Sequence, residues 1–323
     1  AMKANKNFLL AAALLLALTN SQAEDGVSAG EVVLGMANAL SGPAMGLGTG
    51  MRDGSQAYFN KINAAGGIHG RKIKLISTDD GYEPAKTAAA TTKMIEQDKV
   101  FALFGYVGTP TSAAAVPIAS KAGVPYVAPF TGAEALRNPV NKVVFNVRAS
   151  YFDETEAQVE HLTKDLGIKK IGVFIQDDAY GAAGKGGVLK ALSKRSLTLA
   201  GEGKYKRNTV EVDDGVATLK AAQPEAIVMV GAYKACAAFV KKAKAQGIQA
   251  KFLNVSFVGT MDFIKEAGPD GDGVYITQVV PAPDDDSVPI VKKYQGDMKA
   301  AGKNEFDYTS LEGYIGAAVI SEG

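Results

Sequence analysis

The stretch GYVGTPTS at 105–112 is the part of the sequence best suited to holding a small charged molecule. It follows the apolar run VFALF at 100–104, so the pattern predicts a buried strand, a small-residue turn and then a helix. Thr109 suits the N-cap, where its oxygen accepts a free backbone N–H, and Pro110 suits the first helical position. Such a turn directs unpaired N–H groups and the positive end of the helix dipole at one small volume. We therefore expect an anion at this turn.

Catalytic and nucleotide-binding motifs elsewhere in the chain are incomplete. The run GAAGKG at 181–186 misses the spacing of a phosphate loop and has Gly186 where Ser or Thr is needed. The run GLGTG at 46–50 lacks the third glycine of a dinucleotide fingerprint, and loop glycines explain it more simply. Asp79 and Asp80 have acid–base chemistry, but no nucleophile accompanies them. We predict that the protein is not an enzyme and has no cofactor.

The sequence also lacks a convincing set of metal ligands. His69 and His161 lie far apart in the sequence, and the single cysteine, Cys236, is typical of a small buried hydrophobic residue. The run Asp284-Asp285-Asp286 lacks the spacing of a calcium loop and fits a solvated turn. We predict no metal site, and a lone cysteine also excludes an internal disulfide.

The composition is typical of a globular protein without a nucleic-acid partner. The chain has 323 residues, of which 47% are hydrophobic and 21% charged, and its formal net charge is +1. This length allows two domains of ordinary size. We find no run of Lys and Arg dense enough for nucleic-acid binding, which excludes that class of partner.

The N-terminus has the pattern of an export signal. Lys3 and Lys6 precede an apolar run at 8–18 that is too short to span a bilayer, and Ser21-Gln22-Ala23 forms a small-x-small cleavage site. We assign 1–23 to a cleavable signal peptide. Since no cysteine stands at the cleavage site, we expect a periplasmic protein without a lipid anchor.

Strand-like and helix-like segments alternate along the rest of the chain, which predicts an α/β fold with parallel sheets covered on both faces. Interruptions at 143–153 and 279–289 divide the pattern and predict two doubly wound lobes joined by a multi-segment hinge. The expected boundaries are 24–147 with 283–323 for the N-terminal lobe and 148–282 for the C-terminal lobe. The expected elements of the second series are helix 152–166, strand 169–175, helix 181–195, strand 225–231, helix 233–246 and strand 273–280.

Four turns at expected strand ends are rich in small and aromatic residues. They are SGPAMGLG at 41–48, DDGYEP at 79–84, GYVGTPTS at 105–112 and APFTGAE at 128–134. Each taken alone fits ordinary loop packing. Because ligands of open parallel sheets lie beyond the carboxyl ends of the strands, four such turns on one sheet edge favour a binding site.

Three stretches resemble one known family. LSGPAMGLG at 40–48, NKINAAGGIHGRKIKLISTDD at 60–80 and PVNKVVFNVRAS at 139–150 are similar to the periplasmic leucine/isoleucine/valine-binding proteins, and the similarity spans Glu31 to Ile320. The resemblance implies a type I solute-binding protein of an ABC importer, with two lobes joined by three crossings and the ligand between them. Since only two crossings are found here, we expect a C-terminal piece beyond Gly323 to be missing.

The resemblance also implies which residues contact the ligand. Thr109 falls on the position that holds the ligand carboxylate, and Phe130 and Gly132 fall on a second backbone-binding turn. Tyr180 and Tyr233 fall on aromatic positions of the second lobe. The predicted ligand-binding residues, with their neighbours in the same turns, are Leu47, Tyr82, Tyr106, Val107, Gly108, Thr109, Phe130, Thr131, Gly132, Tyr180, Tyr233 and Ser256.

Two departures from the family pattern bear on the ligand. Gly132 lacks the hydroxyl that helps to hold the ligand amine, and Ser256 stands near the position of the carboxylate that pairs with the ligand ammonium. Burying an ammonium without a carboxylate is costly, so these departures argue against an α-amino acid in the usual pose. The aromatic residues among the predicted set offer flat apolar walls and phenol hydroxyls. We therefore favour an aromatic or other organic acid.

The leading hypothesis is a monomeric periplasmic solute-binding protein that delivers a small carboxylate to an ABC permease in the inner membrane. Alternatives are a binding protein for branched-chain amino acids and a ligand-sensing protein that reports to a receptor. An enzyme on the same fold is a further alternative, for which no pairing of a nucleophile with a base is found.

Overall fold

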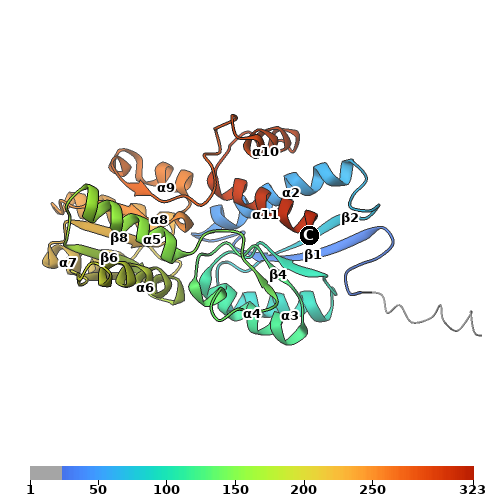
Figure 1. The fold of residues 1–323 in the computed structure, drawn as a ribbon, viewed down its shortest axis with the longest axis horizontal. Coiled ribbons are helices and arrows are strands. Elements are labelled where there is room, and N and C mark those ends of the chain that lie inside the picture. Colours follow the sequence, from blue (N-terminus) through green and yellow to red (C-terminus); the bar gives the residue numbers. More distant parts are fainter. Residues whose placement is uncertain (1–23) are drawn as a thin grey trace, which may run out of the picture.

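A computed structural model describes residues 24–323 and shows two α/β lobes side by side, each built on a five-stranded sheet (Figure 1). All paired strands within the two sheets are parallel. The strand order is β2-β1-β3-β4-β5 in the first lobe and β10-β9-β8-β6-β7 in the second. The prediction of two doubly wound lobes is thus confirmed, while the expected signal peptide lies outside the described residues.

The first sheet consists of strands that become shorter toward one edge. Its strands are β1 (Glu31–Asn38), β2 (Lys72–Asp79), β3 (Ala102–Phe104), β4 (Tyr126–Val127) and β5 (Val144–Phe145). β4 is only two residues long, because Pro125 and Pro129 on either side have no N–H to donate to a neighbouring strand. The helices and short turns that precede the chain crossing are α2 (Met45–Ala64), α3 (Pro84–Glu96), α4 (Thr109–Ala122) and the 3-10 turn η1 (Glu134–Leu136).

The second sheet has a fully buried centre. Both β6 and β8 are buried at every residue, as expected for strands that are covered on both faces. Its strands are β6 (Ile171–Gln176), β7 (Glu202–Tyr205), β8 (Ala226–Val230), β9 (Lys251–Asn254) and β10 (Tyr275–Ile276). Its helical segments are α5 (Tyr151–Glu160), η2 (His161–Asp165), α6 (Ala179–Ser193), α7 (Asp213–Ala222), α8 (Tyr233–Ala245), η3 (Ser256–Val258), α9 (Thr260–Ala267) and η4 (Gly268–Gly271).

Helices cover both faces of the first sheet. Phe59 of α2 and Ala317 of α11 (Tyr308–Glu322) pack on one face, whereas Met94 of α3 and Ala119 of α4 pack on the other. The last two helices, α10 (Pro289–Ala300) and α11, return to this lobe and lie beside α2 (Figure 1). Across residues 24–323 no helix combines the length and apolar character needed to cross a membrane.

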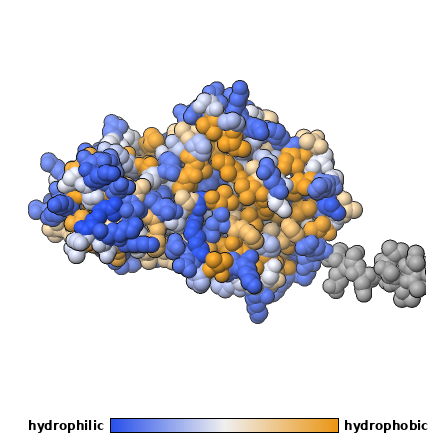
Figure 2. All heavy atoms as spheres, in the orientation of Figure 1, coloured by the Kyte–Doolittle hydropathy of each residue, from blue (hydrophilic) through white to orange (hydrophobic). Residues whose placement is uncertain are grey.

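The two lobes differ in the surface that they present in the orientation of Figure 1. Apolar residues gather over the first lobe near α11, while the second lobe is largely hydrophilic in this view (Figure 2). Exposed apolar side chains of the first lobe include Val140, Phe145 and Val319. On the face shown in Figure 2, the apolar surface is therefore concentrated on the first lobe.

A buried ion pair anchors the chain where it leaves the first lobe after β5. The Nε and Nη2 atoms of Arg148 donate to the two carboxylate oxygens of Glu312 on α11, at 2.8 and 3.0 Å. Both side chains are almost completely buried. Burial opposes the charge on Arg148, but Glu312 and then Glu154 outweigh it and raise the pKa of the guanidinium. Each charge is therefore stable at this depth only while the other is present.

We expect Glu312→Gln to destabilise the protein by about 3–5 kcal/mol, because it leaves the Arg148 charge buried without its partner. The double variant Arg148→Met with Glu312→Leu removes both charges and should lose clearly less. Denaturant unfolding of the two variants and the wild type measures the difference. A double variant as unstable as the single one would contradict this account of the pair.

Candidate ligand-binding site

The carboxyl ends of strands from both sheets face each other across the junction between the lobes. Turns after β2, β3 and β4 carry Tyr82, Thr109 and Phe130, and segments after β6 and β9 carry Tyr180 and Phe257. All five side chains are buried. This is the edge at which open parallel sheets bind ligands.

Aromatic rings from both lobes form one cluster at this edge, which we call the interlobe cluster: Tyr82, Phe130, Tyr151, Tyr180 and Phe257. The ring of Phe257 lies 4.4 Å from that of Tyr180 and 5.3 Å from that of Phe130, measured between centroids. It also lies 6.0 Å from the ring of Tyr82, and Tyr151 lies 5.6 Å from Tyr180. Phe257 therefore contacts rings of both lobes.

Two members of the interlobe cluster were not predicted from the sequence. Tyr151 begins α5, directly after the chain crossing, and Phe257 follows the predicted Ser256. The signal available for Phe257 was its position beside Ser256 in a turn after an apolar run. Tyr151 carried no comparable signal, because only the crossing of the chain brings it to the cluster.

The turn at 105–112 begins a helix as predicted, but Thr109 is not its N-cap. Gly108 occupies the N-cap with a φ of 109°, and Thr109 is the first residue of α4. A Cβ at Gly108 would lie 2.4 Å from the Tyr82 ring, so only glycine permits this approach. The Thr109 side chain is thus free of a capping role, and its Oγ1 lies 2.6 Å from Oγ1 of Thr131.

A short polar chain leads from α4 into the interlobe cluster. The Thr131 hydroxyl donates to the Tyr151 hydroxyl over 3.4 Å, and Thr131 Oγ1 accepts the N–H of Ala133 at 3.2 Å. Thr109, Thr131 and Tyr151 therefore place three hydroxyl groups next to the first turn of α4. Hydroxyl groups and unpaired helix N–H groups together suit an anionic oxygen ligand.

A buried asparagine shapes the backbone that leads into α4. The Asn38 amide at the end of β1 donates to the Gly105 carbonyl at 3.0 Å, and its oxygen accepts the N–H of Val107 at 2.7 Å. Val107 joins the apolar residues of the interlobe region. The neighbouring Tyr106 turns to the opposite face, packs on Tyr126 at 5.0 Å and lies within hydrogen-bond distance of Thr91. The structure thus separates Tyr106 from the other predicted residues, because successive side chains of an extended segment alternate.

The remaining predicted residues lie along the junction of the lobes. The hydroxyl of Tyr233 on α8 accepts the N–H of Gly46 at 3.1 Å, and a Cβ at Gly259 would lie 2.8 Å from Cδ2 of Leu47. The Gly132 carbonyl accepts the N–H of Tyr151 at 2.7 Å, and a Cβ at Gly132 would collide with that tyrosine. The absence of a side chain at Gly132 therefore allows the start of α5 to pack closely against this turn.

The structure corrects one premise of the sequence argument about Ser256. A carboxylate does lie beside it, since Glu154 of α5 accepts the Ser256 N–H at 2.7 Å and the Ser256 hydroxyl at 3.0 Å. The Thr277 hydroxyl donates to the same carboxylate at 2.7 Å. The sequence around Ser256 carries no sign of this carboxylate, because α5 brings Glu154 from 102 positions away.

Comparison with known proteins identifies the family. The family model described as periplasmic binding protein matches residues 31–323. The chain belongs to the periplasmic binding protein family. A relative described as an amino acid binding protein of Pseudomonas aeruginosa is 23% identical and covers 89% of this chain and 78% of its own length.

Solved structures agree with this family. A possible leucine/isoleucine/valine-binding protein of Rhodopirellula baltica is 38% identical, with a TM-score of 0.87 over 94% of this chain and 82% of its own. A fatty acid ABC transporter substrate-binding protein of Thermomonospora curvata is 23% identical, with a TM-score of 0.84 over 93% of this chain and 77% of its own. The resemblance to the leucine/isoleucine/valine-binding proteins is thus confirmed.

A network of charges and amides joins the lobes of this periplasmic binding protein beside Tyr82. Arg207 pairs with Glu83 of the first lobe at 3.0 Å and with Asp178 of the second at 2.9 Å. The Asn208 amide donates to Glu83 at 2.7 Å. Burial opposes ionisation of Glu83, but hydrogen bonds from Arg207 and Asn208 outweigh it and lower the pKa of that carboxyl. The network is built to hold the two lobes together.

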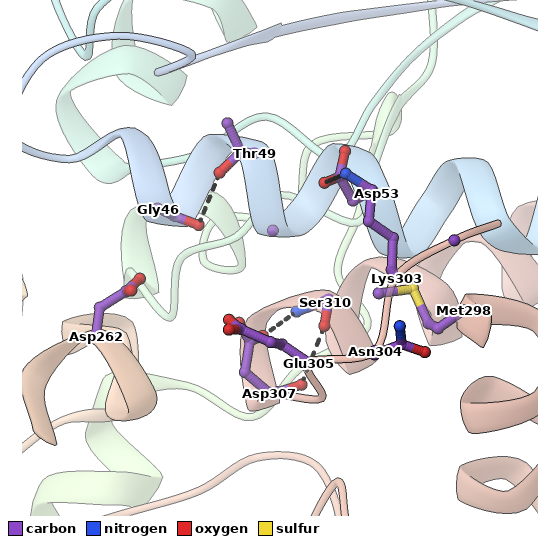
Figure 3. A pocket seen from close by; sticks show the side chains of 12 residues that line it. Gly46, Thr49, Asp53, Asp262, Met298, Lys303, Asn304, Glu305, Asp307 and Ser310 are labelled. Atoms are coloured by element: carbon purple, nitrogen blue, oxygen red, sulfur yellow. Dashed lines mark hydrogen bonds and ion pairs between the residues drawn. The ribbon is translucent and has the colours of Figure 1, made fainter. Parts of the chain in front are cut away.

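A separate pocket of about 380 Å³ lies between α2, α9 and the segment that leads into α11 (Figure 3). It is lined by acidic side chains, among them Asp53, Asp262 and Asp307, and Lys303 pairs with Asp53 at 3.0 Å. Burial and the charge of Asp307 raise the pKa of Asp262. None of the predicted ligand-binding residues lines this pocket.

Asp80 supports the turn that presents Tyr82. Its carboxylate accepts the N–H of Tyr82 and the hydroxyl of Thr87, both at 2.8 Å. Burial raises the pKa of Asp80 to about 6, and the neighbouring charges of Asp79 and Glu83 add to the rise. The stability that the neutral carboxyl contributes is fully present below its ordinary pKa of 3.8 and is lost as the pH rises through 6.

We expect Asp80→Asn to gain stability relative to the wild type, by up to about 3 kcal/mol, between about pH 4 and about pH 7. The amide stays neutral across this window, whereas the wild type must ionise a buried carboxyl. Urea unfolding at several pH values measures the change. Asp153→Asn is the matched control and should give a nearly flat difference over this window, because hydrogen bonds from Ser150 lower the pKa of Asp153 below its ordinary value. A flat difference for Asp80→Asn as well would contradict the assignment.

Proposed function

We propose that this protein is the solute-binding component of an ABC importer and that it holds a small carboxylate between its lobes, with an aromatic or other organic acid favoured over an amino acid. The observation that carries the proposal is the hydroxyl pair of Thr109 and Thr131, 2.6 Å apart at the first turn of α4. Family membership supports solute binding and a periplasmic location.

The start of α4 has the properties that a carboxylate site needs. The first N–H groups of a helix have no carbonyl partner in the helix, and the dipole of a 14-residue helix favours an anion there. Thr109 is 6% exposed, so a hydrogen bond to a ligand here would be shielded from water. The two threonine hydroxyls add donors whose direction can adjust.

The walls of the site favour a flat or apolar ligand body. Beside the hydroxyl groups lie the rings of Phe130, Tyr180 and Phe257, all within 2% exposure. Ligand sites are commonly apolar with a few placed polar groups. Here the aromatic rings supply the apolar walls and the threonine hydroxyl groups supply the polar contacts. An organic acid satisfies both parts.

Delivery to a permease requires the lobes to open and close. We assign 24–147 with 283–323 to the N-terminal lobe and 148–282 to the C-terminal lobe, so the crossings flank Arg148 and Pro283. Closure would form the contacts between Arg207 and Glu83 and between Tyr233 and Gly46. A ligand that binds only the closed form shifts the protein toward it.

We expect Thr109→Val to weaken binding of the preferred carboxylate by about 1–3 kcal/mol, because a buried hydrogen bond is lost while the shape is kept. Thermal-shift screening of organic and amino acids identifies the ligand, since a ligand of the native state must raise the melting temperature. Calorimetry on both proteins then measures the difference.

Thr163→Val is the matched control for this substitution. The Thr163 hydroxyl donates to the Val159 carbonyl within its own helix and does not reach the other lobe. Its affinity should equal that of the wild type. An unchanged affinity in Thr109→Val would remove Thr109 from the site, and a screen without any stabilising acid would refute the proposed ligand class.

A branched-chain amino acid is the second candidate ligand, and Glu154 is the observation that favours it. Its buried carboxylate lies beside Ser256, in the region where an amino acid binder needs a negative charge. The amino acid binding relative in Pseudomonas aeruginosa points the same way. Against it, three donors from Ser256 and Thr277 already occupy the Glu154 carboxylate.

The two candidates differ in what Glu154→Gln does to a matched ligand pair, such as 4-methylpentanoate and L-leucine. Under the proposed function we expect both affinities to change by the same factor, because Glu154 supports the turn and not the ammonium. Calorimetry with both ligands measures the ratio. A selective loss for L-leucine of about tenfold or more would support the amino acid instead, since that is the size of one charged hydrogen bond.

A further inference from the structure

We infer that Phe257 sets the size of the ligand that this protein accepts, an inference that rests on the proposed function. The Phe257 side chain is fully buried and lies between Phe130 and Tyr82 of the first lobe and Tyr180 of the second. No other ring of the interlobe cluster contacts two rings across the junction and one in its own lobe. The Phe257 ring therefore lies where the two lobes meet.

The site has a polar end and an apolar end, and Phe257 lies at the apolar one. The hydroxyl groups of Thr109, Thr131 and Tyr151 form the polar end. From there Tyr151 contacts Tyr180, and Tyr180 contacts Phe257. A ligand whose carboxylate lies at the start of α4 extends its apolar body toward the Phe257 ring, so that ring limits its length.

The turn that carries Phe257 is held firmly. The preceding Ser256 is bound through both its N–H and its hydroxyl to Glu154, as described above. The Gln158 amide donates to the Asn254 carbonyl at 2.8 Å, and the following Gly259 has a φ of 81°. These contacts hold the backbone that carries Phe257, so the ring can move only by rotation about its own side-chain bonds.

Little other space is left where the lobes meet beside Tyr82. The pocket there, which Gln176 and Tyr205 of the second lobe also line, is about 10 Å³. That is about the room of one water molecule. Phe257 does not line that pocket, and its ring instead fills the space between Tyr82, Phe130 and Tyr180. Apolar cavities made by removing such a side chain stay dry and can take up a molecule such as benzene.

The test compares wild type, Phe257→Ala and Phe257→Leu with a series of straight-chain acids from propionate to octanoate, benzoate and 3-phenylpropionate. We expect the preferred chain to lengthen in Phe257→Ala, with affinity for the longer acids rising relative to the shorter ones by about fourfold per added methylene until the space is filled. Phe257→Leu should lie between the two, and it keeps the test available if the alanine variant folds poorly. Calorimetry measures each affinity.

Phe252→Leu is the control for a general loss of packing. Phe252 lies on the same β9–η3 segment, but its ring packs on Phe239 in the core of the second lobe at 6.2 Å. This variant should lose stability and keep the wild-type order of ligands. Wild-type binding with the same order of acids in Phe257→Ala would overturn the inference and leave the proposed function standing. Failure of wild type and both Phe257 variants to bind any acid would refute both.

Discussion

The buried ion pair between Arg148 and Glu312 ties the first chain crossing to α11 of the first lobe. An isolated charge at this depth would be very costly, so in the folded protein the two residues must stay together through any movement of the lobes. The guanidinium also lies over the Phe130 ring, 4.8 Å from its centroid. The pair therefore holds one wall of the site as well as the start of the hinge.

From that wall the site is built by contacts between rings and not by one continuous segment. Phe130 packs on Phe257, whose turn is anchored through Ser256 to Glu154 on α5. α5 itself begins at Tyr151, next to the crossing. The polar and apolar halves of the candidate site are thus linked by one short helix that follows the chain crossing, so under the proposed function ligand contact and lobe position would depend on each other.

The alternation of apolar runs and helices was enough to predict the two-lobe fold, because central parallel strands are buried on both faces and their composition shows it. The same reasoning missed β7 and α7, which lie between the expected helix at 181–195 and strand at 225–231. It also missed β9 and α9, which lie between the expected helix at 233–246 and strand at 273–280. β7 is the four-residue sequence EGKY at a sheet edge, and α7 contains Gly215. Edge strands and glycine-containing helices carry weak local signals, since their partners supply the stability.

By itself the sequence determined the turns that lie at the carboxyl ends of β2, β3 and β4, because small and aromatic residues follow each strand-like run. It did not determine which side chains of those turns meet. Tyr106 was predicted beside Val107, but alternation along the chain directs it to the α3 and α4 face. Phe257, Tyr151 and Glu154 reached the site only through the packing of one lobe on the other and of α5 on β9. Local patterns report burial and turns, whereas contacts between distant segments are decided by how the two sheets face each other.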